Sequence, residues 1–269
     1  MADTPSRRYR WAEYKTTEFE NLDPQKVVAV LPTAAIEQHG PHLPVGVDTY
    51  LNEGMLSTVE AMLPDLAPDL DVRILPVQAI GKSNEHLHAP GTLTLPAELA
   101  LSIWTEIGLS VARAGVRKMV ITNSHGGNLD LISILSREMR VRARMLCVKS
   151  QWGNWGVPDG LYTEDEMKFG IHGGDVETSM MLHFHENLVD MSKAENFRST
   201  AEDRQGGFNI SPTGMPAYGW ISSDLNTEGT VGDASIATAD KGRQTAEHYA
   251  RGFIGLLKDV AEADITRFD

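Results

Sequence analysis

The chain contains the apolar run Val27-Val28-Ala29-Val30-Leu31, followed by the polar segment Glu37-Gln38-His39-Gly40-Pro41-His42-Leu43-Pro44 and then by Asp48. The apolar run predicts a strand. In an extended segment residues two apart point the same way, so Glu37 and His39 can face one point in space. A carboxylate oxygen and an imidazole nitrogen aimed together make half of a divalent metal shell, and Asp48 can add an oxygen. The alternative is a polar loop whose histidines bond only backbone groups.

Apolar, β-branched runs alternate with amphipathic ones along the rest of the chain. The predicted strands cover residues 27–31, 72–77, 118–122 and 144–149, and the predicted helices cover 49–62, 96–114, 129–141, 176–185 and 237–260. Asp48 or Thr49 is expected to cap the first helix and Asn128 the third. Strand–helix alternation predicts one α/β domain over residues 1–269, a mostly parallel sheet flanked by helices on both faces. Residues 201–233, rich in Gly, Ser, Pro and Asn, predict long loops near the site.

Composition and charge exclude several classes of protein. Of the 269 residues, 41% are hydrophobic and 23% charged, which is ordinary for a globular protein, and the net charge of −13 argues against nucleic-acid or anionic-membrane partners. No signal peptide or transmembrane segment is evident. Cys147, the single cysteine, lies in an apolar run and is expected in the core rather than as a nucleophile. We therefore expect a cytoplasmic protein that acts on a small molecule.

Five residues form the candidate metal site. His125 follows the third predicted strand, Glu177 lies in the first turn of the fourth predicted helix, and the set is completed by Glu37, His39 and Asp48. Three carboxylates in one pocket cannot all stay ionised without compensation. Two divalent cations and a bridging hydroxide would bring the site to neutrality, so the charge balance favours a binuclear centre bridged by Asp48. In such a centre the hydroxide attacks the carbonyl that the metals polarise.

Four spaced motifs resemble the creatininase family of metal-dependent amidohydrolases. They are residues 37–44 with Asp48, residues 123–128 (Asn-Ser-His-Gly-Gly-Asn), the segment around Glu177, and residues 229–234 (Gly-Thr-Val-Gly-Asp-Ala) with Ala237-Thr238 and Lys241-Gly242. The resemblance covers most of the chain. It implies a creatininase-like α/β fold, two divalent metal ions (zinc with iron or manganese) and often a homohexamer.

One departure from the family bears on the substrate. Creatinine-hydrolysing members place a metal-binding glutamate two residues after the histidine that matches His125, and this chain has Gly127 there. Glu177 is our candidate for the missing ligand. The proton-shuttling histidine of those enzymes would fall near Thr178, so creatinine is expected to be a poor substrate. The resemblance then favours opening of a cyclic amide or cleavage of a related C–N bond. The alternatives are ring opening of a cyclic ketone at a C–C bond, and a non-catalytic relative that binds a small molecule.

Further histidines are candidates for proton transfer. Glu177, His172 and His86 are the catalytic candidates, and His172 or His86 would protonate the leaving group. Either histidine can instead order a loop, and His86 can also contact the substrate. His42 and Asn128 are expected to support the metal ligands from behind. The glycine pairs in the chain do not form the G-x-G-x-x-G or G-x-x-x-x-G-K-[ST] patterns of nucleotide-binding loops, which argues against that class.

Overall fold

The computed structural model describes residues 7–204 and 209–268. Its centre is a four-stranded parallel sheet with the order β2-β1-β3-β4. The strands are β1 (Val28–Thr33), β2 (Val72–Ile74), β3 (Lys118–Asn123) and β4 (Leu146–Gln151). All four predicted strands are therefore present. β2 ends earlier than expected, shortly before Pro76, which has no N–H for the ladder.

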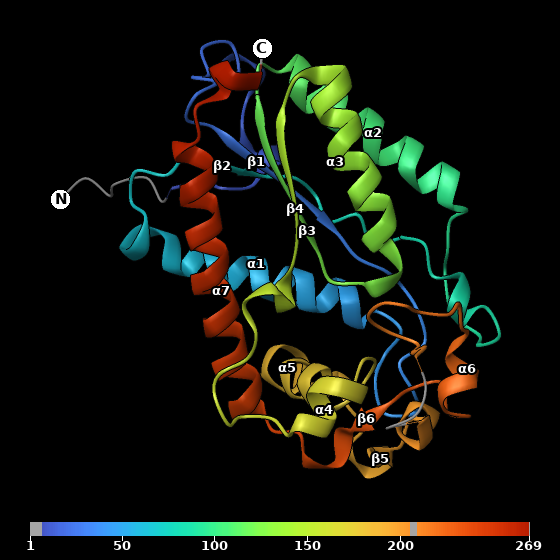
Figure 1. The fold of residues 1–269 in the computed structure, drawn as a ribbon. Coiled ribbons are helices and arrows are strands. Elements are labelled where there is room, and N and C mark those ends of the chain that lie inside the picture. The colour runs from blue at the N-terminus through green and yellow to red at the C-terminus, as the bar shows by residue number, and fades with distance from the viewer. Residues whose placement is uncertain (1–6, 205–208, 269) are drawn as a thin grey trace.

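Helices cover both faces of this sheet, as predicted. One face carries α1 (Val47–Leu66), α5 (Asp175–His185) and α7 (Ala239–Glu262), and the other carries α2 (Ala97–Arg113) and α3 (Leu129–Ala143) (Figure 1). The strand β1 serves both cores because successive side chains point to opposite faces. Val28 and Val30 pack with α1 and α7, whereas Ala29 and Leu31 pack with α2 and α3. The fold class is thus confirmed.

The predicted cap of α1 is wrong, and that of α3 is confirmed in position only. The N-cap of α1 is Gly46, and Asp48 lies inside the first turn. Asn128 does occupy the N-cap position of α3, but its side chain makes no capping bond. Both side chains that were expected to cap have other partners, since Thr49 Oγ1 donates to Ala35 O and Asn128 Nδ2 donates to Ala34 O. These bonds tie the helix starts to the loop that follows β1.

Short elements fill the region beyond the carboxyl ends of the strands, in the lower part of Figure 1. They are α4 (Glu164–Phe169), α6 (Ser222–Leu225) and the antiparallel pair β5 (Asn196–Phe197) and β6 (Gly232–Asp233). The sequence predicted only long loops at 201–233, and α6, β5 and β6 within or beside that segment were not predicted. Residues 205–208 of the segment lie outside the described part of the chain. This region closes over the edge of the sheet where the polar motifs lie.

Two other expectations concern the remainder of the chain. Cys147 packs against the core between the sheet and α2–α3, and burial raises the pKa of its thiol to about 12. A side chain held in this way is a core residue and not a ready nucleophile. None of the helices formed by the described residues is both long and apolar enough to cross a membrane.

Candidate metal centre

The structure brings the five predicted site residues together at the carboxyl edge of the sheet. The loop after β1 carries Glu37 and His39, the first turn of α1 carries Asp48, the end of β3 leads into His125, and the first turn of α5 carries Glu177. The first four are almost completely buried, whereas the side chain of Glu177 keeps 23% of its surface exposed. Glu177 is therefore the carboxylate of this cluster that solvent or a substrate can reach.

Asp48 lies between the two halves of the cluster. Its Oδ1 is 3.6 Å from His39 Nε2, and its Oδ2 is 3.3 Å from His125 Nδ1. On the His125 side, Glu37 Oε1 lies 3.2 Å from the same Nδ1. On the His39 side, Glu177 Oε2 lies 3.7 Å from Nε2. The arrangement is two groups of donor atoms that share one aspartate.

Backbone carbonyls fix the tautomers of three histidines. The contacts join His39 Nδ1 to Glu37 O at 3.0 Å, His125 Nε2 to Lys82 O at 2.9 Å, and His172 Nε2 to Gln38 O at 2.7 Å. A carbonyl oxygen only accepts, so the nitrogen facing it carries the hydrogen. In the neutral ring the other nitrogen then presents a lone pair, and in each case it faces a carboxylate. His39 Nε2 and Asp48 Oδ2 are buried without a hydrogen-bond partner.

A lone pair that faces a carboxylate is repulsive unless a proton or a metal cation lies between them. The gaps between the nitrogens and oxygens of the five residues are 3.2–3.7 Å. Two donors that each lie about 2.0–2.2 Å from one ion are themselves roughly 3–4 Å apart. The donor types, the gaps and the unpartnered buried atoms therefore all fit divalent metal ions.

The charges of the cluster influence one another strongly. Burial opposes protonation of His39, but the carboxylates of Asp48 and Glu177 raise its pKa to about 9. Burial raises the pKa of Glu177 to about 7, against the effect of His39. Burial also opposes the ionisation of Glu37, yet His125 holds the pKa of that carboxyl well below its usual range. The three carboxylates thus compete for positive charge, as expected of a site that binds cations.

His86 and His172 extend the cluster on one side of Glu37. His86 Nε2 lies 3.5 Å and His172 Nδ1 lies 3.6 Å from Glu37 Oε1, and the centroids of the two rings are 4.4 Å apart. Burial lowers the pKa of both imidazoles, and the neighbouring His39 further lowers that of His172. Both rings are therefore neutral groups. His88, in contrast, is exposed to solvent.

His42 and Asn128, which were predicted to support the metal ligands, lie beside the cluster and make no contact with its carboxylates in the hydrogen bonds described. His42 Nε2 is 3.0 Å from Thr178 Oγ1, next to Glu177 in α5, and burial lowers the pKa of His42 to about 4. Asn128 bonds Ala34 O through its Nδ2 and accepts from Lys82 N at 3.0 Å. Thr178 itself faces His42 and not the carboxylates. The imidazole that faces the cluster from this segment is His172.

Gly127 has no room for a side chain. A Cβ at this position would lie 2.2 Å from Glu85 Oε1 and 2.5 Å from His125 Nε2. The Glu85 carboxylate is itself held by Lys82 Nζ at 2.8 Å. A glutamate at 127 would therefore displace both neighbours. In this chain the carboxylate beside His39 comes from Glu177 instead.

Two residues of the site were missed from the sequence. Ser83 Oγ donates to Glu37 Oε2 at 2.5 Å, and Gln38 Nε2 donates to His86 Nδ1 at 3.0 Å. Gln38 lies inside the motif at 37–44, so its position was a usable signal. Ser83 had no such signal, because its role depends on how the loop before α2 folds over the end of β1.

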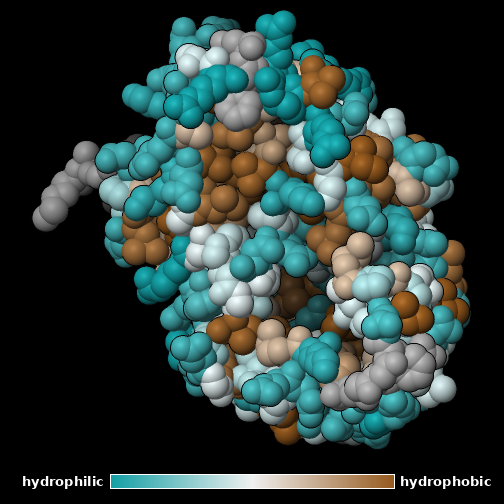
Figure 2. Space-filling model, viewed as in Figure 1, coloured by the Kyte–Doolittle hydropathy of each residue, from teal (hydrophilic) through white to brown (hydrophobic). Residues whose placement is uncertain are grey.

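A cavity of about 280 Å³ adjoins His125 and Glu177. Much of its wall is apolar and includes Leu51, Trp152, Ile171, Val176, Met180 and Tyr249. Figure 2 shows a hollow in the lower half of the molecule, on the side of the sheet where α4 and α5 lie. None of the residues that line the cavity in the described part of the chain is Lys or Arg. A substrate bound there would meet apolar groups and the open carboxylate of Glu177.

The chain is similar to proteins of known activity over most of its length. The family model described as "Creatininase: Creatinine amidohydrolase" matches residues 12–257. A creatinine amidohydrolase from Pseudomonas putida is 28% identical over 93% of this chain and 94% of its own length. A mycofactocin precursor peptide peptidase from Mycobacterium tuberculosis is 31% identical over 80% of this chain and 78% of its own.

Solved structures show the same fold. A creatininase mutant described as "Zn-Zn type" superposes with a TM-score of 0.71 at 21% identity, covering 93% of this chain and 97% of its own. A structure described as "Creatininase Mn" superposes with a TM-score of 0.71 at 23% identity, covering 94% and 98%. The family model and the relatives define a hydrolase, and the structure gives it an α/β fold with candidate metal-binding clusters. The chain belongs to the creatininase family.

Proposed function

We propose that this chain is a hydrolase with two divalent metal ions that opens a cyclic amide or cleaves a related C–N bond in a small molecule. The observation that carries the proposal is the set of imidazoles whose tautomers are fixed by backbone carbonyls and whose bare nitrogens face carboxylates. Glu37 and His125 would hold one ion, and His39 and Glu177 the other, with Asp48 between them. Bound divalent ions lower the pKa of water and polarise a carbonyl group. Zinc with iron or manganese is the pair we expect.

The chain's own residues supply the proton transfer. Amide hydrolysis moves a proton from the attacking water to the leaving nitrogen. His172 is fixed at Nε2 by Gln38 O, so its free Nδ1 can accept a proton and return it. His86 presents its Nε2–H toward Glu37 Oε1, 3.5 Å away, because Gln38 Nε2 occupies its Nδ1. Burial keeps both rings neutral, which is the state that these two roles require.

The cavity supports a neutral or cationic substrate. Glu177 is the carboxylate among its lining residues, and the rest of the lining offers apolar and uncharged polar groups. A polyanion would be repelled by this carboxylate and by the acidic protein as a whole. Creatinine should be hydrolysed poorly if at all, because Gly127 leaves no space for the carboxylate that creatinine-hydrolysing relatives carry there.

Elemental analysis combined with a substrate panel tests the function. Protein expressed with ample metal should contain close to two divalent ions per chain, and fewer than about half an ion would contradict the binuclear centre. The panel should include cyclic amides, formamides, cyclic ketones and creatinine. Activity on a cyclic ketone alone would support the proposed metal site but assign it to C–C bond hydrolysis instead of C–N bond hydrolysis. Brisk, metal-dependent creatinine turnover would overturn the substrate assignment.

We also propose that the protein works in the cytoplasm as a homo-oligomer, and that it is a hexamer as the family resemblance implies. The single cysteine, partly buried at Cys147, supports a reducing compartment. Sedimentation velocity on the purified protein measures the oligomeric state directly. A monomer at micromolar concentration would contradict the expected hexamer.

A further inference from the structure

A buried carboxylate lies outside the proposed centre and has no role in it so far. Glu166, in α4, is only 4% exposed. Its Oε1 accepts a hydrogen bond from Val176 N at 3.3 Å, and its Oε2 accepts one from Asp233 N at 3.0 Å. The carboxylate therefore joins the first turn of α5 to the short strand β6. Burial raises its pKa to about 7, and these backbone N–H groups act in the opposite direction.

Three glycines surround this carboxylate. A Cβ would lie 2.2 Å from Glu166 Cδ if built at Gly170, 2.4 Å from Oε1 at Gly174, and 2.7 Å from Oε2 at Gly232. All three distances are below any normal contact, so the backbone of three segments approaches the carboxylate closely. Gly232 also has a φ of +121°, which residues with a side chain rarely adopt. The cradle is built for a carboxylate at this place.

The segments that meet at Glu166 also carry the site. Glu177 lies in the turn of α5 that Glu166 caps, and its Oε2 accepts from Gly173 N at 2.6 Å. The carbonyl of His172 accepts from Thr230 Oγ1 at 2.6 Å and from Val231 N at 2.8 Å. Residues 230–233 are thus tied to His172 at one end and to Glu166 at the other. A shift of this strand or of the first turn of α5 would move both site residues.

We propose that Glu166 is a positioning residue that sets Glu177 and His172 relative to the rest of the centre. The inference rests on the proposed function for the importance of those two residues. The chemical reason applies above about pH 7, where this carboxylate is ionised and accepts hydrogen bonds on both oxygens, whereas an amide accepts on one and points its NH₂ group at a backbone N–H. The helix N-terminus also favours a negative charge at this point. Glu166→Gln should therefore weaken the hydrogen bonds that hold the first turn of α5 and β6, while the side chain still fills nearly the same volume.

Hydrogen exchange in the metal-free protein tests the positioning directly. In Glu166→Gln, amides of residues 172–178 should exchange about tenfold faster or more, while amides of β1 and β3 stay unchanged. The matched control is Glu60→Gln, a half-buried carboxylate on α1 that pairs with Arg10 and lies outside the site. It should leave residues 172–178 unchanged. Equal exchange in wild type and Glu166→Gln would overturn the proposal, whatever the protein catalyses.

Metal affinity and kinetics then separate positioning from a general loss of stability. In a chelator competition with zinc, Glu166→Gln should lower the affinity for one of the two ions about 10–100-fold and the affinity for the other by less than about threefold. In steady-state kinetics, kcat should fall with KM nearly unchanged. An equal loss of affinity for both ions would contradict the proposal. If wild-type protein binds no metal, the proposed function fails, but the exchange result still decides the positioning. If Glu166→Gln does not fold, Glu166→Asp keeps the charge and carries the same measurements.

Discussion

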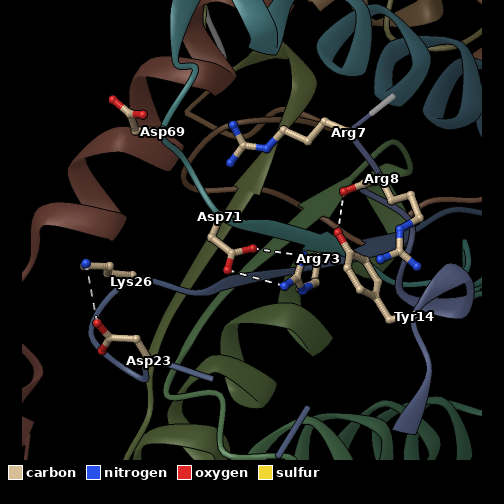
Figure 3. A pocket seen from close by; sticks show the side chains of 8 residues that line it. All are labelled: Arg7, Arg8, Tyr14, Asp23, Lys26, Asp69, Asp71 and Arg73. Carbon is tan, nitrogen blue, oxygen red and sulfur yellow. Dashed lines mark hydrogen bonds and ion pairs between the residues drawn. The ribbon is translucent and has the colours of Figure 1, made fainter. Parts of the chain in front are cut away.

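The amino ends and the carboxyl ends of the parallel strands form two edges of the sheet, and the charged side chains at these two edges have different partners. At the amino ends of the strands a cavity of about 510 Å³ is lined by Arg7, Arg8, Tyr14, Asp23, Lys26, Asp69, Asp71 and Arg73 (Figure 3). At the carboxyl ends the cavity beside Glu177 is smaller, about 280 Å³. Neither the larger volume nor the larger number of charges makes the amino edge a reactive centre.

The difference lies in how the charges are satisfied. At the amino edge Arg73 Nη1 lies 2.9 Å from Asp71 Oδ1, and Lys26 Nζ lies 3.8 Å from Asp23 Oδ2, so charges of opposite sign are matched (Figure 3). At the carboxyl edge, buried His39 Nε2 and Asp48 Oδ2 have no hydrogen-bond partner. Unsatisfied buried polar atoms are costly unless a ligand completes them. Arg73 Nε at the amino edge is also buried without a partner, but only at the carboxyl edge do the unpartnered atoms belong to groups of imidazoles and carboxylates that could hold a cation, among the described residues.

Asp48→Ala should produce the largest effect that this comparison predicts. Asp48 stands between the two halves of the centre, so its loss should remove bound metal and lower kcat/KM by more than about 100-fold, beyond the usual effect of residues behind the ligands. Elemental analysis and steady-state kinetics measure both. The counterpart at the other edge, Asp71→Asn, should leave metal content and activity unchanged. Equal losses in the two variants would erase the distinction between the edges.

His42→Ala should have an intermediate effect. His42 touches Thr178 Oγ1 and stacks on Phe197 with a centroid distance of 5.3 Å, but it meets no carboxylate of the centre. Removing it should cost about 10–100-fold in metal affinity or activity. If His42→Ala lost as much metal as Asp48→Ala, His42 would have to be counted as a ligand. The same assays on both variants decide this.

The sequence predicted the parts of the site that depend on local chemistry and strand order. Apolar runs at β1 and β3 followed by polar residues were sufficient to place Glu37, His39 and His125 at one edge. Glu177 was included because it lies in the first turn of a predicted helix, although nothing local shows that α5 folds back against Asp48. Ser83 and Glu166 could not be predicted, since each acts through contacts between segments far apart in the chain. The predicted cap at Asp48 is wrong for the same reason, because the Asp48 side chain faces His39 and His125 from distant segments.

Metal uptake at the carboxyl edge should depend on pH. Neighbouring carboxylates raise the pKa of His39 to about 9, so at neutral pH the metal-free ring carries a proton that a metal must displace. Apparent affinity should therefore rise with pH, by up to about tenfold per unit between pH 6 and 8 for each proton released. Calorimetry in buffers of different ionisation enthalpy measures the protons released. Affinity that stays constant or falls between pH 6 and 8 would contradict the displacement of a proton from His39.

The smallest effect is expected from the paired charges at the amino edge. Arg73 bonds Asp71 and lies over the Tyr14 ring, with its guanidinium carbon 3.7 Å from the ring centroid. Arg73→Met keeps much of the apolar contact and removes the ion pair, so it should cost about 1 kcal/mol or less in the free energy of unfolding. Urea denaturation of the metal-free protein measures this cost. Metal content and kcat should stay at wild-type values, because this edge pairs arginine and lysine with aspartate and lies outside the groups of histidines and carboxylates that could hold a metal ion. A loss of metal in Arg73→Met would show that the two edges are coupled through the sheet.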